Sequence, residues 1–191
     1  MTPSRHPDLR VSFAGIDLKN PVIAASGTFG YGREFENFLD ISRLGAVAVQ
    51  GLTLEARSGN PPPRVVEPPA GMLNAIGLAN VGVERYLAEK LPYLRQFDTP
   101  IIANISGFSI EEYVALTERL CEARGADLIE VNVSCPNVHS GCISIGSDPT
   151  ETRAVVSAVR EVWPSPALLI VKLTPNVTDA VPIASAAEEA G

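Results

Sequence analysis

The sequence predicts an α/β protein, and the fold class that we expect is a (β/α)8 barrel. Short apolar strands alternate with segments that carry apolar residues at helical spacing, which is typical of a parallel sheet covered by helices. The turn at residues 26–32 follows the first main strand but lacks the glycine spacing of a dinucleotide-binding fold. Polar residues also stand at the carboxyl ends of nearly every predicted strand, which is the active-site edge of a barrel. The number of βα units alone would also fit a doubly wound sheet, so the last two observations favour the barrel.

The predicted elements follow a regular order along the chain. Residues 11–18 alternate and end at an Asn-Pro pair, which predicts a short strand or hairpin ahead of the main fold. Ser109 and Glu112 have the spacing of a helical capping box, and we expect Gly125 to close the same helix. The main strands are predicted at 22–26, 46–50, 100–106, 128–134 and 167–173, and the helices at 33–44, 84–94, 109–124, 149–162 and 178–190.

The length of the chain sets the expected extent of the barrel. A whole barrel takes about 250 residues, whereas this chain has 191 and ends where a sixth strand is expected. We therefore expect a single domain over residues 1–191, a barrel truncated after about five βα units. One connection, residues 51–83, is rich in proline but contains an apolar stretch at 72–80. Long connections in compact domains are functional or disordered, and the apolar stretch favours a loop that folds over the edge and touches a ligand.

Composition excludes several classes of function. The net charge is −7 and no cluster of Lys and Arg occurs, so nucleic acid and anionic membrane surfaces are poor partners. No apolar run approaches the ~20 residues of a membrane span, and the amino terminus does not resemble a secretory signal. The three cysteines, Cys121, Cys135 and Cys142, are too few and too uneven for a disulfide scaffold and favour a reducing compartment, the cytoplasm. Two histidines and the lack of a CxxC pattern argue against a metal site.

The segment 132–137, Asn-Val-Ser-Cys-Pro-Asn, is the strongest candidate for a reactive centre. Cys135 follows a predicted strand and precedes a proline, so it is expected in a turn at the active edge rather than in the core. A thiol can act as base or nucleophile when its surroundings favour the thiolate. The neighbouring Asn132 and Asn137, together with Asn74 and Asn104, offer donors and acceptors that suit a planar heterocycle.

Two further positions are candidates for cofactor contacts. Lys172 stands in a run of Leu, Ile and Val, so its ammonium either extends to the edge of the sheet or pairs with an anion. A redox cofactor that gains electrons would be stabilised by such a cation. Ser26 opens a Ser-Gly-Thr segment that either contacts a cofactor or forms a simple turn, and Cys121 is assigned to helix packing.

Four segments together resemble the class 1 dihydroorotate dehydrogenases: residues 20–30, 59–64, 71–80 and 131–138. The resemblance extends from about Val11 to the end of the chain. Class 2 enzymes have Ser where this chain has Cys135, and the forms Asn-Ala-Ile-Gly-Leu and Cys-Pro-Asn-Val resemble the NAD-linked class 1B. The family is identified by the combination, since each segment alone is common.

The resemblance implies a fold, a cofactor and a reaction. FMN would lie at the carboxyl edge of the barrel with dihydroorotate stacked on its ring. Cys135 would remove the C5 proton while hydride passes from C6 to flavin N5, giving orotate in pyrimidine biosynthesis. Class 1B enzymes work with a second subunit that carries FAD and a 2Fe–2S cluster and passes electrons to NAD, and a homodimer core within a heterotetramer is expected. The implied FMN contacts are Ser26, Gln50, Gly51, Asn104, Asn132 and Lys172, and the implied substrate contacts are Gln50, Asn74, Ala75, Ile76, Gly77, Leu78 and Asn132.

Two positions depart from the family pattern. The family has Lys where this chain has Gln50, and Gln brings a donor but no charge. The segment 142–146 also differs from the Gly-Met/Leu-Ala/Ser-Phe-Gly form usual there. Gln50 and the expected truncation favour one alternative, an inactive or degenerate member of the family. Two others stay open: the pyrimidine-reducing domain of a dihydropyrimidine dehydrogenase, and a flavin-free aldolase-type barrel with Lys172 as its Schiff-base lysine.

Overall fold

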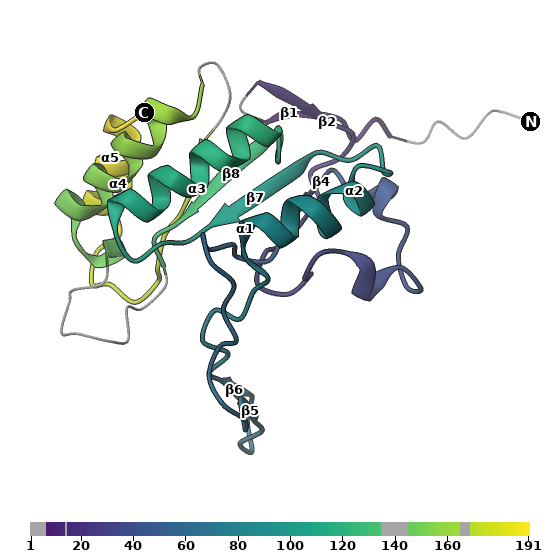
Figure 1. The fold of residues 1–191 in the computed structure, drawn as a ribbon, viewed down its shortest axis with the longest axis horizontal. Coiled ribbons are helices and arrows are strands. Elements are labelled where there is room, and N and C mark those ends of the chain that lie inside the picture. The colour runs from purple at the N-terminus through teal and green to yellow at the C-terminus, as the bar shows by residue number, and fades with distance from the viewer. Residues whose placement is uncertain (1–6, 14, 135–144, 165–168) are drawn as a thin grey trace, which may run out of the picture.

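A computed structural model describes residues 7–13, 15–134, 145–164 and 169–191 (Figure 1). Its centre is a five-stranded parallel sheet with the strand order β3-β4-β7-β8-β9, so each strand pairs with the strand of this sheet that precedes it in the chain. A doubly wound sheet would reverse this order at a switch point. The sequential order therefore favours the barrel. The strands are β3 Ile23–Ala24, β4 Ala46–Ala48, β7 Ile101–Ile105, β8 Leu128–Asn132 and β9 Leu169–Lys172.

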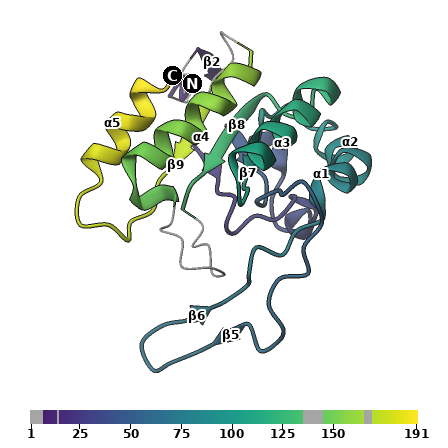
Figure 2. The ribbon, with the colours of Figure 1, turned by 60° about the vertical axis from the view of Figure 1, so that its left-hand side comes forward.

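Helices cover the outer face of this sheet (Figure 2). Ser109 Oγ accepts from the Glu112 backbone N–H at 3.3 Å, and Glu112 Oε2 accepts from Phe108 N–H at 2.8 Å, so the predicted capping residues do start α3. At its end the left-handed residue is Arg124, with φ 51°, while Gly125 donates back to Leu120 O at 2.8 Å. The helices are α1 Gly82–Arg85, the π-helical turn η3 Tyr86–Lys90, α2 Leu91–Leu94, α3 Ile110–Ala123, α4 Pro149–Val162 and α5 Val181–Glu189.

The helix predicted at residues 33–44 is wrong. Two short 3-10 turns stand there instead, η1 Arg33–Phe35 and η2 Ile41–Arg43. Asp40 separates them because its backbone is extended (φ −73°, ψ 111°) and its side chain accepts from Ser42 N–H at 2.9 Å. Such a local side-chain hydrogen bond competes with helix formation. The apolar spacing that suggested a helix reflects burial of residues on separate turns.

The sheet has a different core on each face. The outer face packs under the helices, through residues such as Val47, Ile105 and Val131. The inner face is apolar at the amino ends of the strands, where the antiparallel hairpin of β1 Val11–Phe13 and β2 Ile16–Leu18 packs against it. The predicted hairpin is therefore confirmed, and it covers one end of the inner face. This inner apolar cluster contains Leu18, Ala46, Ala48, Ile102 and Leu128, with Val11, Phe13, Ile16, Ile23 and Ile170 partly buried against it.

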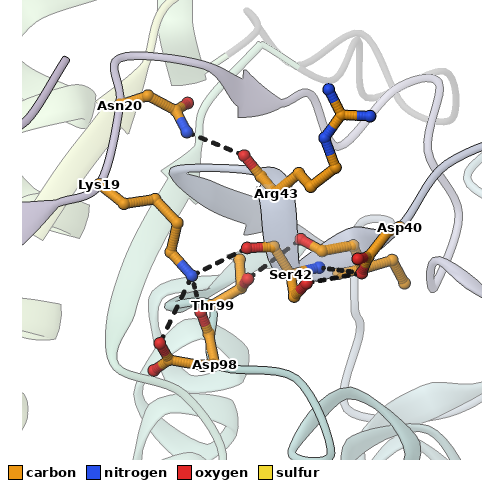
Figure 3. Close-up of polar contacts among 8 residues, drawn as sticks. Lys19, Asn20, Asp40, Ser42, Arg43, Asp98 and Thr99 are labelled. Atoms are coloured by element: carbon orange, nitrogen blue, oxygen red, sulfur yellow. Dashed lines mark hydrogen bonds and ion pairs between the residues drawn. The ribbon is translucent and has the colours of Figure 1, made fainter. Parts of the chain in front are cut away.

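A polar cluster fixes the chain just after this hairpin (Figure 3). Lys19 Nζ donates to Ser42 O at 2.9 Å and to Asp98 O, which ties the hairpin to η2 and to the loop before β7. Thr99 Oγ1 donates to Ile41 O at 3.0 Å, and Asn20 Nδ2 donates to Arg43 O at 2.8 Å. All four of these bonds end on backbone carbonyls, three of them in η2 and one in the loop before β7. The amino end of the sheet is therefore closed by both apolar packing and hydrogen bonds.

The long connection after β4 forms an arm, residues 54–79, that projects from the body (Figures 1 and 2). Its two sides pair from a bridge between Arg57 and Asn80 at the base to the short strands β5 Val65–Val66 and β6 Leu73–Asn74 near its outer end. The connection is therefore an ordered two-stranded element. In the described part of the chain, no helix has the length and apolar character needed to cross a bilayer.

Candidate functional site

Alternation along the strands places polar side chains at the carboxyl end of the inner face. Residues two apart on a strand share a face. Asn104 follows Ile102 by two positions, and Glu130 follows Leu128 by two, so both continue the inner face beyond the apolar cluster. In the register of the sheet Asn104 lies beside Glu130. Asn132 lies beside Lys172 in the same way on β8 and β9.

Hydrogen bonds join these side chains into one chain of contacts, called the polar chain below. Lys172 Nζ donates to Ser26 Oγ at 3.2 Å, and Ser26 Oγ donates to Glu130 Oε1 at 3.0 Å. Asn104 Nδ2 donates to the same Glu130 oxygen. Asn132 Nδ2 then donates to Asn104 Oδ1 at 3.3 Å. The structure thus brings together four of the predicted cofactor residues, from the turn after β3 and from β7, β8 and β9: Ser26, Asn104, Asn132 and Lys172.

Glu130 joins the two halves of the polar chain, and the sequence reasoning missed it. It is half-buried and accepts from both Ser26 and Asn104. A signal for it was present, since Leu-Ile-Glu-Val-Asn places a carboxylate inside an apolar strand just as Lys172 places an ammonium. The two expected readings of Lys172 were an extension to the edge or pairing with an anion. In the structure Lys172 donates to the Ser26 hydroxyl, which in turn donates to Glu130, so a serine links the ammonium to the carboxylate.

Asn132 also shapes the turn that follows β8. Its Oδ1 accepts from Ser134 N–H at 3.0 Å and from Ser134 Oγ at 2.5 Å. Its backbone carbonyl accepts from Tyr113 Oη of α3 at 2.8 Å. The chain therefore leaves the sheet in a direction fixed from both faces. The predicted Cys135, Asn137 and Cys142 lie outside the described residues.

Gln50 and Gly51 stand where β4 leads into the arm. Gln50 Nε2 donates to Ala79 O, so its side chain binds the returning side of the arm rather than the polar chain. A Cβ at Gly51 would lie 2.9 Å from Asn104 Oδ1 and 3.1 Å from Leu78 Cδ1. Glycine is therefore needed where the arm crosses the edge beside Asn104.

The predicted substrate segment, residues 74–78, divides between the edge and the arm. Asn74 belongs to β6 near the outer end of the arm and is exposed, as are Ala75 and Ile76. Leu78 lies at the base, within reach of Gly51. The structure thus brings one end of this segment to the polar chain and leaves the other end on the arm. The arm extends from the body on the side where the strands end (Figures 1 and 2), and whether it folds over a ligand stays a prediction.

Asn80 anchors the base of the arm and was not singled out from the sequence. Its Oδ1 accepts from Gly82 N–H at 2.9 Å and from Thr53 N–H at 3.3 Å, while its Nδ2 donates to Leu78 O at 2.9 Å. The Arg57 guanidinium lies 4.5 Å from the centre of the Phe108 ring, which adds a cation–π contact at the same place. The base of the arm is fixed to the body even though its outer part is exposed.

Cys121 has the packing role expected of it. It lies on α3 against the outer core, and burial raises the pKa of its thiol. A raised pKa keeps the thiol neutral and poorly nucleophilic at neutral pH. Cys121 is therefore a suitable internal control for experiments on the other cysteines.

These features define the class: an α/β-barrel protein whose inner face is apolar at one end and carries a hydrogen-bonded set of amides, a carboxylate and an ammonium at the other. Comparison with known proteins gives the family. The family model described as dihydroorotate dehydrogenase matches residues 8–191, and the chain belongs to this family. The resemblance inferred from the sequence motifs, and the barrel fold class, are thereby confirmed.

Individual relatives agree with this assignment. The chain is 52% identical over 185 residues to a protein of Geotalea uraniireducens and 53% identical over 184 residues to one of Caldicellulosiruptor bescii. Both are named "Dihydroorotate dehydrogenase B (NAD(+)), catalytic subunit". The alignments cover 97% and 96% of this chain and 60% of each relative, so the chain spans about three-fifths of their length. A solved structure of DHODH from Eimeria tenella in complex with ferulenol matches with a TM-score of 0.74 at 22% identity, over 100% of this chain and 59% of that one, and this likeness shows the fold alone.

Proposed function

We propose that the protein, at the full length of its relatives, is an FMN-dependent dihydroorotate dehydrogenase that forms orotate in pyrimidine biosynthesis. The observation that carries the proposal is the polar chain, in which Lys172, Ser26 and Asn104 meet at the carboxyl edge of the sheet. In a barrel this edge is the place for catalysis.

The donor set of the edge fits a flavin. Amide side chains offer both donors and acceptors, as the alternating C=O and N–H groups of a flavin ring require. Asn104 is only 1% exposed, so its amide is held in a fixed place. Gly51 leaves room beside it that a Cβ would fill. Lys172 supplies a cation next to these amides.

Each residue of the proposed site then has a role. Ser26, Gly51, Asn104, Asn132 and Lys172 would hold FMN, with Gln50 at the place where the family resemblance implies lysine. The segment 74–78 would hold dihydroorotate together with Asn132 and Gln50, and Cys135 would remove the C5 proton as general base. FMN, when bound, would accept the hydride.

The name of the relatives suggests the partners. "Catalytic subunit" is said of those proteins, and by the same family relation we propose a second subunit that carries FAD and a 2Fe–2S cluster and passes electrons to NAD. The proposed assembly is a homodimer of the catalytic subunit within a heterotetramer. The few cysteines favour the cytoplasm as its compartment.

Gln50 supports a second candidate, a family member with slow or no turnover. Its amide binds Ala79 O and brings no charge to the edge. By analogy with an oxyanion donor, a cation beside a group that becomes negative during the reaction lowers the reaction barrier by about 2.7–4 kcal/mol. Such a protein would still bind FMN.

The test uses the protein at the full length of its relatives, purified and saturated with FMN. Orotate formation from dihydroorotate is followed by absorbance with an artificial electron acceptor. We expect turnover in the parent and in Cys121→Ala, and a loss of at least a hundredfold in Cys135→Ala. Bound FMN without turnover in the parent would favour the second candidate, and no FMN binding would overturn both.

A further inference from the structure

We infer that Asn80 is a positioning residue that acts through Leu78. Its side-chain amide holds Leu78 in a left-handed backbone conformation, and the Leu78 side chain thereby forms an apolar wall beside the polar chain for a bound ring. The inference rests on the proposed function for the identity of the ring, which is that of dihydroorotate or orotate. The conformation of Leu78 and its link to Asn80 follow from the protein alone.

The turn where the arm returns to the body has two successive residues with positive φ, Gly77 at 75° and Leu78 at 56°. Glycine is needed at the first position, because a Cβ there would lie 2.7 Å from the backbone nitrogen of Asn60. At the second position leucine is strained, since residues other than glycine rarely have a left-handed backbone. Strained residues cluster at sites that bind ligands. The leucine side chain therefore has a role that glycine, the unstrained choice, could not fill.

The Leu78 side chain reaches the carboxyl edge of the sheet. A Cβ at Gly51 would lie 3.1 Å from Leu78 Cδ1 and 2.9 Å from Asn104 Oδ1, so the leucine and the amide meet beside this glycine. Asn104 offers hydrogen-bonding groups, and Leu78 adds apolar surface next to them. Ligand sites combine apolar walls with a few fixed polar groups in this way. A ring with polar edges and apolar faces fits the combination.

Asn80, which is 9% exposed, holds the Leu78 backbone. Its Oδ1 accepts from two backbone N–H groups, Gly82 at 2.9 Å and Thr53 at 3.3 Å, which fixes the direction of the amide. Its Nδ2 then faces Leu78 O and donates to it at 2.9 Å. In the part of the chain that the structure describes, the Leu78 backbone makes no other hydrogen bond. The left-handed conformation of Leu78 therefore depends on Asn80.

Other residues hold the peptide groups before and after this carbonyl. Ile76 O accepts from Asn60 N–H at 3.0 Å. Ala79 O accepts from Gln50 Nε2. These bonds fix the two ends of the turn but leave the direction of the side chain between them open. The Asn80 amide supplies the missing constraint.

The first experiment needs no ligand and compares Leu78 with Leu73, an exposed leucine of β6 on the same arm. Each leucine is replaced by alanine and by glycine in the protein at the full length of its relatives, and chemical denaturation gives the free energy of unfolding. Glycine weakens a strand, so we expect Leu73→Gly to be less stable than Leu73→Ala. At positive φ the order reverses, so we expect Leu78→Gly to be more stable than Leu78→Ala. The same order at both positions would overturn the inference.

The second experiment also needs no ligand. Asn80→Asp keeps the shape and the acceptor of the side chain but loses the N–H group that reaches Leu78 O. With leucine methyl groups labelled, NMR reports whether Leu78 stays beside the α-protons of Gly51. We expect a nuclear Overhauser contact between them in the parent that is lost in Asn80→Asp. Asn37→Asp, the same change on an exposed loop, should keep it. An unchanged contact in Asn80→Asp would refute the role of Asn80.

The third experiment measures orotate affinity of the FMN-loaded protein from the change in flavin absorbance. We expect Leu78→Gly to weaken orotate binding on the order of tenfold, because the apolar contact of one leucine is lost. Leu73→Ala should bind orotate as the parent does. A merely structural Leu78 predicts that affinity falls only together with stability, so a loss of affinity in a stable Leu78→Gly supports the wall. Unchanged affinity in Leu78→Gly would contradict it.

A double-mutant cycle tests whether Asn80 acts through Leu78. Asn80→Asp should weaken orotate binding in the parent and add little in Leu78→Gly, where no side chain is left to place. The added charge is the same in both backgrounds, so equal losses would mean that Asn80 does not act through Leu78. Failure of the parent to bind orotate would count against the proposed function. The order of stability and the NMR contact would still decide whether Asn80 holds a strained Leu78.

Discussion

The two ends of the inner face of the sheet differ although the same strands build both. At the amino end Ile102 and Leu128 are fully buried under the β1–β2 hairpin, and the Lys19 cluster closes the loops around it. Two residues further along the same strands, Asn104 and Glu130 belong to the polar chain. A step of about 7 Å along a strand therefore separates apolar packing from polar chemistry.

This difference indicates that the two ends of the strands have different roles, one in stability and the other in ligand binding. Apolar contacts do not depend on direction, so the amino end tolerates small shifts and contributes mainly stability. Hydrogen bonds depend strongly on geometry, so the carboxyl end needs fixed side chains. Damage at one end should therefore change the free energy of unfolding, and damage at the other should change ligand binding or reaction rate.

The largest expected effect comes from breaking the amino end. Leu128→Ala removes a side chain that is 0% exposed, and we expect it to lower the free energy of unfolding by about 2–5 kcal/mol. Chemical denaturation measures this loss. FMN affinity of the remaining folded protein should stay within about twofold of the parent. A large loss of affinity in the folded protein would show that the two ends are coupled.

The next effect comes from adding charge at the carboxyl end. Gln50→Lys places a cation where the family resemblance implies one, and we expect faster reduction of bound FMN by dihydroorotate, with the barrier lower by at most about 4 kcal/mol. Stopped-flow absorbance measures the rate, and Gln50→Met serves as the uncharged control. An unchanged rate in Gln50→Lys would remove Gln50 from the explanation of any slow turnover.

A smaller effect tests how the Lys19 cluster holds the amino end. Lys19 donates to two backbone carbonyls, while its ion pair with Asp98 spans 3.6 Å to a fully exposed carboxylate. We expect Lys19→Met to lower the free energy of unfolding by about 1–2 kcal/mol, and Asp98→Asn to change it by less than about 0.5 kcal/mol. Equal losses in the two variants, measured by denaturation, would mean that the ion pair matters after all.

The smallest effect at neutral pH concerns the outer face and gives the alkaline limit of the scaffold. Burial raises the pKa of Tyr86, whose hydroxyl donates to Gly125 O at 2.8 Å. In the unfolded chain a tyrosine releases its proton near pH 10, whereas folded Tyr86 keeps it. The unfolded state then binds fewer protons, so the stabilising contribution is complete below about pH 10 and is lost as pH rises above it.

Tyr86→Phe is the matching variant. We expect it to lower the free energy of unfolding at pH 7 by about 1 kcal/mol, because a hydrogen bond is lost. Above pH 10 its stability should fall less steeply than that of the parent. Burial also raises the pKa of Tyr31, so part of the slope should remain. Parallel curves for parent and variant would show that Tyr86 does not set the alkaline limit.

Much of the fold could be predicted because local patterns specify it. The strands β7 and β8 are rich in Ile, Leu and Val, and the start of α3 is marked by Ser109 as a capping residue. The segment 33–44 could not be predicted in this way, because the hydrogen bond of Asp40 to Ser42 depends on a turn that apolar spacing does not reveal.

The site was predicted in part for a similar reason. Lys172 was noticed because a charge in an apolar strand is unusual, and Ser26, Asn104 and Asn132 came from the edge position and the family resemblance. Glu130 is likewise a charged residue in an apolar strand. Its contacts with Ser26 and Asn104 could not be predicted, because they depend on how β7, β8 and the turn after β3 lie together. For the arm, the length of the connection was evident from the sequence, but the pairing of its two sides, which includes the bridge between Arg57 and Asn80, was not.

The sequential order of the strands has a consequence for synthesis. Since each strand of the parallel sheet pairs with the one made just before it, the sheet can extend one strand at a time as the chain leaves the ribosome. The arm is completed before β7 and does not delay that pairing. The hairpin made first must wait longest, because its partners Ile102, Leu128 and Ile170 emerge only later, and until then its apolar side chains lack these partners.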